Sequence, residues 1–89
     1  MATPELSIII PVYNEEENLL RVREAFEQYF PNAKIPSKII FVNDGSQDKS
    51  LQVIRQINEA NPLFTYISFE RNVGLSAAIK AGFDHAAHS

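Results

Sequence analysis

Three short apolar runs, separated by helical stretches, limit most strongly what this chain can form. They occupy residues 6–10, 39–42 and 64–69, and the first two are rich in β-branched side chains. Because regular polar alternation is missing, the runs indicate strands covered on both faces, as in a parallel sheet. Parallel strands need long crossovers between them, so the sequence predicts an α/β fold with right-handed helical connections.

Apolar residues at three- and four-residue steps predict three helices between and after these strands. The positions are Leu19, Val22, Phe26 and Tyr29 or Phe30 in the first helix, Leu51, Ile54 and Ile57 in the second, and Leu75, Ala78, Ile79, Phe83 and Ala86 in the third. The resulting order, β-α-β-α-β-α, predicts a Rossmann-like three-layer sandwich with a parallel sheet. Eighty-nine residues allow one domain, residues 1–89, and three strands look like the first half of a larger α/β domain.

Capping residues indicate where the helices begin. Asn14, with Glu17 three residues later, predicts the start of the first helix. Ser46 or Asp48 predicts the cap of the second helix. Ahead of the third helix, the segment 72–74 (Asn-Val-Gly) predicts unusual backbone angles at its asparagine and its glycine.

Composition excludes several classes of function. The net charge of -3 gives no general attraction to a nucleic acid, so we expect no nucleic-acid partner. The chain has no cysteine, which excludes disulfides and thiolate metal sites. His85 and His88 are three residues apart, but without a third ligand nearby we expect no metal site. Neither a membrane-spanning stretch nor a signal peptide is evident, so we expect a cytoplasmic chain.

Polar clusters follow each of the three predicted strands, at residues 11–15, 43–46 and 70–74. In open α/β sheets, ligands bind beyond the carboxyl ends of the strands. Since the strands are expected to be parallel, the three clusters should meet on one edge of the sheet. The sequence therefore predicts a ligand site there.

Each candidate residue of this edge has two interpretations. Asp44 lies in a turn-forming sequence, but its place after a strand favours a carboxylate that accepts hydrogen bonds from a base. The ring of Tyr13 either covers the core or stacks on a planar base. Pro11 would hold the strand exit rigid, and Glu15 could touch the base. Arg71 either faces a diphosphate or is a solvated surface side chain.

Four motifs in this order resemble the beginning of a family 2 glycosyltransferase. They are Ile-Ile-Pro-Val-Tyr-Asn-Glu at 9–15, Val-Asn-Asp-Gly-Ser-Gln-Asp at 42–48, Arg-Asn-Val-Gly at 71–74 and Ala-Gly-Phe-Asp-His-Ala at 81–86. The resemblance covers residues 5–88 and is closest to the polyprenyl-phosphate branch, which is dolichol-phosphate mannosyltransferase-like. It implies the first half of a GT-A fold that binds a nucleoside-diphosphate sugar.

The resemblance also implies the activity of the parent enzyme. That enzyme would transfer the sugar, with inversion, to a lipid-phosphate or saccharide acceptor, as in cell-wall or polysaccharide biosynthesis. Sugar transfer of this kind would place the full-length protein at the inner face of the membrane.

Six positions are implied as contacts of the nucleotide sugar: Pro11, Tyr13, Glu15, Val42, Asp44 and Arg71. By the family pattern, the first three contact the base and ribose. Asp44 binds the base edge with Val42 beside it, and Arg71 lies near the diphosphate.

The chain departs from the family pattern in three respects. Asn43 stands where many members have a second aspartate. Leu75 stands where lipid-phosphate members often carry a lysine, which bears on the diphosphate contact and on the lipid acceptor. The Asp-x-Asp motif that holds Mg²⁺ or Mn²⁺ and the catalytic base belong to later parts of the family sequence and are absent here. We therefore expect this chain alone to bind nucleotide without transferring sugar.

Two other classes of protein share parts of this pattern. A receiver-like signalling module is also α/β with an aspartate near a strand end, but here the third predicted strand leads into Glu-Arg-Asn at 70–72. A dinucleotide-binding half-domain needs Gly-x-Gly-x-x-Gly after the first strand, and no glycine precedes Gly45. Apart from function, an uncovered sheet edge predicts that the chain self-associates.

Overall fold

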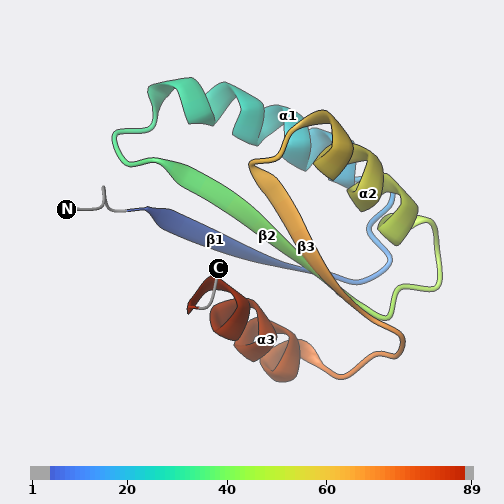
Figure 1. Cartoon of the computed structure of the whole chain (residues 1–89). Coiled ribbons are helices and arrows are strands. Elements are labelled where there is room, and N and C mark those ends of the chain that lie inside the picture. The colour runs from blue at the N-terminus through green and yellow to red at the C-terminus, as the bar shows by residue number, and fades with distance from the viewer. Residues whose placement is uncertain (1–4, 88–89) are drawn as a thin grey trace.

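The computed structural model describes residues 5–87, in which strands and helices alternate strictly (Figure 1). In chain order the elements are β1 (Leu6–Val12), α1 (Leu19–Tyr29), the short 3₁₀ helix η1 (Phe30–Asn32), β2 (Ser37–Asp44), α2 (Ser50–Ala60), β3 (Phe64–Phe69) and α3 (Leu75–Ala87). The predicted α/β order is confirmed. Strands β1 and β2 each continue two residues beyond their predicted ends, so that Asp44 is still a strand residue.

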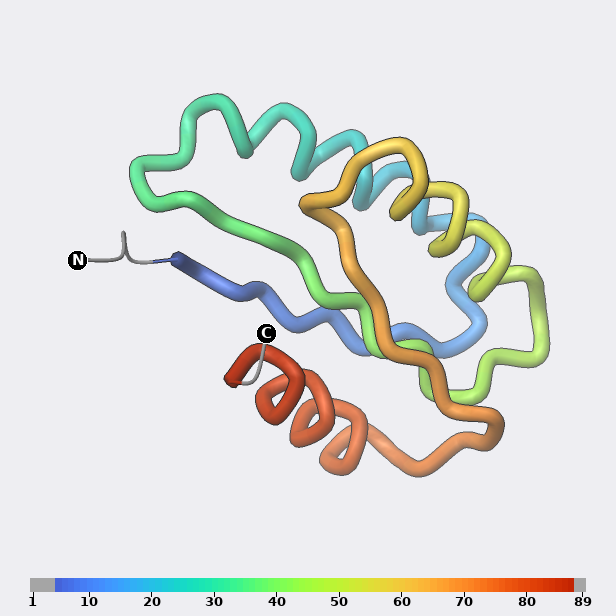
Figure 2. Tube along the Cα trace, in the orientation of Figure 1, coloured from blue at the N-terminus to red at the C-terminus, as the bar shows by residue number. Residues whose placement is uncertain are grey.

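The three strands form one parallel sheet in the order β1-β2-β3. Ile9 on β1 lies opposite Ile40 on β2, and Val42 on β2 lies opposite Ile67 on β3. Helices α1 and α2 cover one face of the sheet and α3 covers the other (Figures 1 and 2). The result is the expected three-layer sandwich, with β2 in the centre.

The core is divided by the sheet into two clusters, and β2 contributes to both. Ile39 and Phe41 point into the cluster beneath α1 and α2, whereas Ile40 and Val42 point toward α3 and pack with Ala78. All five side chains are fully buried. Because successive strand residues face opposite sides, a strand buried on both faces needs the uninterrupted apolar run seen in the sequence.

Helix α3 packs on the sheet through small residues, and this corrects its predicted apolar face. Ala78 and Gly82 are buried, while Leu75 and Phe83 remain 62% and 63% exposed. A Cβ atom on Gly82 would lie only 2.5 Å from Cγ2 of Ile9. The helix backbone therefore sits close to β1, and the larger side chains on either side of this contact point outward.

The predicted start of the first helix is wrong. Helix α1 begins at Leu19, and Asn14 instead has a left-handed backbone with φ of 52°. Its side-chain oxygen accepts a hydrogen bond from the backbone N–H of Gln47, at 2.8 Å. The asparagine is thus used to join two loops, so it is not available as a helix cap.

Helix α2 is held at its start in a slightly different way from the predicted cap. Its N-cap position is Lys49, which makes no side-chain cap hydrogen bond. The carboxylate of Asp48, one residue earlier, accepts a hydrogen bond from the backbone N–H of Ser50, at 2.9 Å.

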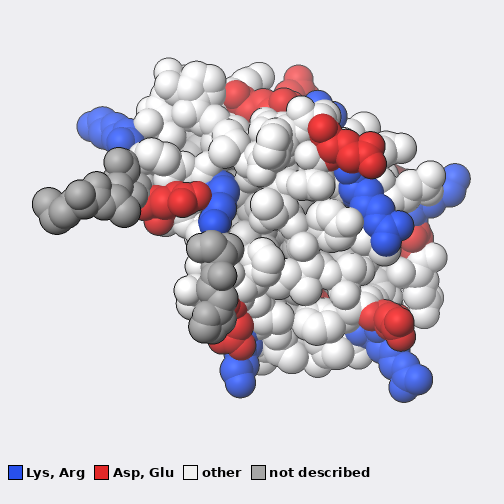
Figure 3. Space-filling view, in the orientation of Figure 1, with Lys and Arg blue, Asp and Glu red and all other residues white. Residues whose placement is uncertain are grey.

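Within residues 5–87, no helix is both long and apolar enough to cross a membrane. On the face shown in Figure 3, acidic and basic side chains are scattered around an uncharged centre, without a large patch of either sign.

Candidate functional site

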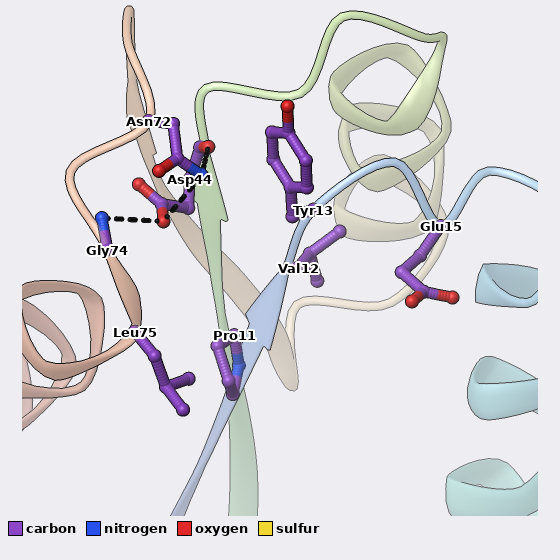
Figure 4. A pocket seen from close by; sticks show the side chains of 8 residues that line it. All are labelled: Pro11, Val12, Tyr13, Glu15, Asp44, Asn72, Gly74 and Leu75. Carbon is purple, nitrogen blue, oxygen red and sulfur yellow. Dashed lines mark hydrogen bonds between the residues drawn. The ribbon is translucent and has the colours of Figure 1, made fainter.

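A cavity of about 330 Å³ lies at the carboxyl ends of the strands (Figure 4). Its lining residues are Pro11, Val12, Tyr13, Glu15, Asp44, Asn72, Gly74 and Leu75. They come from the last residues of β1 and β2, from the loop after β1, and from the β3–α3 connection with the first residue of α3. The structure thus brings together the three polar clusters that the sequence places after its predicted strands. The volume is at the lower end of the range typical of small-molecule sites.

Tyr13 gives the cavity an accessible aromatic ring. The residue is 44% exposed, and Figure 4 shows its ring standing free on the other side of the cavity from Asp44 and Asn72. Pro11 lies lower on β1, between them in this view. A half-exposed ring held at the end of a strand can stack on a planar group without prior rearrangement.

Asp44 gives the cavity a buried carboxylate. The residue is only 5% exposed, and Figure 4 shows its side chain turned toward the β3–α3 connection. Its carboxylate accepts hydrogen bonds from the backbone N–H groups of Val73, at 2.6 Å, and Gly74, at 3.1 Å. The side-chain amide of Asn72 donates a third, at 3.1 Å. Asp44 therefore holds this connection in place while lining the cavity.

Gly45 allows the loop after β2 to touch the loop after β3. Its φ of 67° is left-handed, and a Cβ atom built on it would lie 2.3 Å from the carbonyl carbon of Arg71 and from the nitrogen of Asn72. The two backbones thus pack directly against each other. A side chain at this position would push the β3–α3 connection away from Asp44.

A second hydrogen-bond network joins the segment after β1 to the segment after β2. Four of its bonds run from the N–H of Asn14 to Ser46 Oγ (3.0 Å), from the N–H of Glu15 to Ser50 Oγ (2.9 Å), from the N–H of Glu16 to Asp48 Oδ2 (3.2 Å) and from the N–H of Gln47 to Asn14 Oδ1 (2.8 Å). Because Tyr13 directly precedes this network, its backbone is positioned relative to the end of β2.

The network also changes the acidity of Asp48. Burial raises the pKa of this carboxyl group, but hydrogen bonds from Ser50 and from the backbone N–H of Glu16 outweigh that effect. The pKa of Asp48 consequently lies below its ordinary value of 3.8.

The structure brings four of the six predicted contact residues to the cavity: Pro11, Tyr13, Glu15 and Asp44. The carboxylate of Glu15 points toward α1, where it accepts a hydrogen bond from the Asn18 side chain at 2.9 Å. Val42 is fully buried in the core beneath α3. Arg71 is exposed and lies outside the cavity lining.

Sequence reasoning missed the part played by Asn72. Gly74 has the expected positive φ, at 97°, whereas Asn72 does not. Asn72 instead uses its side chain, which donates to the Asp44 carboxylate. The sequence offered one indication of this role, because Asn72 is a polar residue in the segment after β3, which neighbours β2. Only the folded structure shows that its partner is Asp44.

The donor atoms of the described residues do not fit a divalent metal ion. Within residues 5–87, no three of the His, Cys, Asp and Glu side chains gather as a metal site would require, and Mg²⁺ or Mn²⁺ favours several oxygen ligands at once. His85 lies in the last turn of α3, and His88 lies outside the described residues.

Comparison with known proteins places the chain near sugar-transferring enzymes. Residues 7–88 match the profile described as glycosyl transferase family 2. CsbB of Bacillus subtilis (strain 168), which is named as a glycosyltransferase, is 45% identical over 80 residues, or 90% of this chain and 24% of that protein. The bactoprenol glucosyl transferase of Shigella phage SfV is 34% identical over 82 residues, or 92% of this chain and 27% of that protein. The chain spans about a quarter of the length of these curated relatives.

A solved structure supports the fold. The mannosyltransferase PcManGT from Pyrobaculum calidifontis, in complex with GDP-Man and Mn²⁺, matches with a TM-score of 0.69 at 20% sequence identity. The match covers 96% of this chain and 25% of that one. The arrangement of strands and helices therefore corresponds to the first part of a GT-A fold.

Proposed function

This chain belongs to glycosyltransferase family 2, and from that membership we propose that it is the nucleotide-sugar-binding part of an inverting glycosyltransferase. The observation that carries the proposal is the cavity at the carboxyl edge of the sheet. It places an accessible aromatic ring, Tyr13, and a buried carboxylate, Asp44, around one space of suitable size.

The proposed binding mode follows from the chemistry of these two side chains. The base of the nucleotide stacks on Tyr13 and directs a ring N–H group toward Asp44. Pro11 and Glu15 contact the base and the ribose from the β1 side. Arg71, which is exposed outside the cavity, is the positive charge that faces the diphosphate.

The reaction proposed for the whole protein needs groups that this cavity does not contain. Relatives that are named bactoprenol glucosyl transferases support a lipid-linked acceptor, with a saccharide as the other possibility. Inverting transfer to a saccharide hydroxyl needs a base that activates the acceptor, whereas a lipid phosphate is already ionised near neutral pH. The sequence contains no Asp-x-Asp motif. We therefore assign the metal ligands and that base to regions outside this chain, and we place the whole protein at the inner face of the membrane.

The receiver-like alternative has little chemical support at Asp44. A phosphorylated aspartate must offer a reactive carboxylate oxygen, whereas this carboxylate is 5% exposed and already accepts three hydrogen bonds. Uptake of phosphate at Asp44 would be the result that revives this alternative.

The first test is a chemical-shift titration of the chain with UDP and with GDP. Signals from Tyr13 and Asp44 should both move, because the two residues border one cavity. Tyr13→Ala should weaken binding by about 1–3 kcal/mol through loss of stacking, whereas Tyr13→Phe, which keeps the ring, should bind like the wild type. Shifts confined to the region of His85 would rule out the proposed site.

The second test concerns activity. The purified chain should transfer no sugar to a lipid-phosphate or saccharide acceptor with any divalent metal ion, because it lacks the Asp-x-Asp motif. Sugar transfer by a sample free of full-length enzyme would contradict the proposal that the metal ligands and the catalytic base lie outside this chain.

A further inference from the structure

The hydrogen-bonding capacity of Asp44 is nearly used up by its own chain. Oδ1 accepts from the N–H of Val73, at 2.6 Å. Oδ2 accepts from the N–H of Gly74 and from the Asn72 amide, both at 3.1 Å. An ionised carboxylate has about four acceptor positions on its two oxygens. One position therefore remains, and it is on Oδ1.

The three donors cannot easily move away when a ligand arrives. The backbone at Gly45 packs directly on that of Arg71 and Asn72, so the β3–α3 connection is held against the end of β2. Leaving a buried carboxylate without these partners would also cost the hydrogen bonds that compensate its burial. The number of acceptor positions offered to a ligand is therefore set before the ligand binds.

Nucleobases differ in how many adjacent donors they present to a carboxylate. Uracil has one ring N–H group, flanked by two carbonyl oxygens. Guanine presents a ring N–H group beside an amino group, and a carboxylate satisfies both only by accepting on two positions. A carboxylate with one free position matches uracil and leaves one guanine donor without a partner.

We propose that Asn72, together with the backbone N–H groups of Val73 and Gly74, determines the base specificity of this site by leaving Asp44 a single acceptor position. The site then selects a base with one ring N–H donor, such as uracil, over guanine. The inference rests on the proposed function of the same cavity. Asn72 acts here as a positioning residue, because it works through Asp44 and need not touch the base.

The test compares the affinities of the full chain for UDP and for GDP by titration calorimetry or chemical shifts. The wild type should bind UDP at least about tenfold more tightly, a ratio that corresponds to about 1.4 kcal/mol. Asn72→Ala frees a second acceptor position, on Oδ2, and should bring the UDP-to-GDP ratio close to one. Asn32→Ala is the matched control, because Asn32 is exposed in η1 and its side chain donates to Gln28 O, at 3.2 Å, far from Asp44 in the sequence. This variant should keep the wild-type ratio.

Each outcome decides between the two proposals. Wild-type protein that binds GDP as tightly as UDP would contradict the base selection but leave the nucleotide site standing. Binding of neither nucleotide at millimolar concentration would remove the proposed function and this inference together. If Asn72→Ala does not fold, Asn72→Leu, which keeps a side chain of similar size but has no donor, takes its place. A folded variant that retains the wild-type ratio would show that Asn72 does not set the specificity.

Discussion

At the scale of single residues, the clearest contrast is between Gly45 and Gly74. Both have left-handed backbones, with φ of 67° and 97°. A Cβ atom on Gly45 would collide with the backbone of the β3–α3 connection, whereas one on Gly74 would have no neighbour within 4 Å. Glycine is therefore favoured at position 74 by its backbone conformation alone. At position 45 it is favoured both by the backbone conformation and by the lack of space for a Cβ atom.

We predict that Gly45→Ala destabilises the protein more than Gly74→Ala does. Conformational strain should cost about 1–2 kcal/mol in each variant. The overlap with backbone atoms, which cannot move aside as a flexible side chain can, should add about 1–3 kcal/mol at position 45. Urea unfolding of both variants measures the difference in unfolding free energy. Equal losses would show that the contact between the two loops is easily displaced.

At the scale of elements, the fit of α3 against β1 depends on the absence of a side chain at Gly82. Alanine has the better helix propensity, by about 1 kcal/mol. Against this gain stands the 2.5 Å approach of its Cβ atom to Cγ2 of Ile9. Because a β-branched isoleucine has few alternative rotamers, the helix itself would have to move.

We therefore predict that Gly82→Ala lowers the unfolding free energy by about 1–3 kcal/mol. Ile9→Ala, which removes the two nearest atoms, should cancel much of the clash, so a double-mutant cycle should show strong coupling between the two positions. The control is Ser76→Ala, since Ser76 is an exposed position of the same helix. Additive effects of the Ile9 and Gly82 substitutions would contradict the packing argument.

We predict that the stability of the protein depends on pH through Asp48, whose carboxylate joins the loop before α1 to the start of α2 by accepting hydrogen bonds from the N–H groups of Glu16 and Ser50. Its pKa is lower in the folded protein than the ordinary value of 3.8. The resulting stabilisation is therefore fully present above that value and is lost as the pH falls through the folded-state pKa. Asp48→Asn should lower the unfolding free energy at neutral pH and flatten its decline below about pH 4. Identical pH dependence in the wild type and the variant would argue against this role.

At the scale of the whole molecule, β1 leaves one edge of the sheet open within the described residues. The N–H of Leu6 donates to Pro36 O, at 2.8 Å. The backbone N–H and C=O groups of alternate residues of β1 therefore point toward β2, and those of the residues between them point along the sheet toward its open edge. The residues whose backbone groups point toward the open edge are Ser7, Ile9 and Pro11. Pro11 has no N–H group to leave unpaired, which is where a proline is tolerated in an edge strand.

We predict that the chain self-associates through this edge, with a symmetric dimer as the expected form. Burial of exposed apolar surface would add about 25 cal/mol per Å², and Phe83 on α3 is one such group, 63% exposed. Sedimentation at micromolar concentration measures the association. Ser7→Pro, which removes an outward N–H group, should weaken it, whereas Ser7→Ala should not. A monomeric wild type would show that the edge is stable in water.

Local patterns in the sequence were sufficient to predict the order of strands and helices and the parallel arrangement, although not the start of α1 or the buried face of α3. Apolar periodicity depends only on neighbouring residues, and a strand buried on both faces, such as β2, must be apolar throughout. The rule that ligands bind beyond strand ends then led to Tyr13 and Asp44, both of which line the cavity.

Only the tertiary structure decided how the polar side chains pair. Asn14 resembles a helix cap in sequence but bonds to Gln47, 33 residues away, and Asn72 bonds to Asp44 across 28 residues. Val42 is only two residues before Asp44 in the sequence, yet its side chain points into the core beneath α3. A hydrogen bond depends on which donors and acceptors the fold brings within about 3 Å, and the sequence around each residue contains no record of a partner so far along the chain.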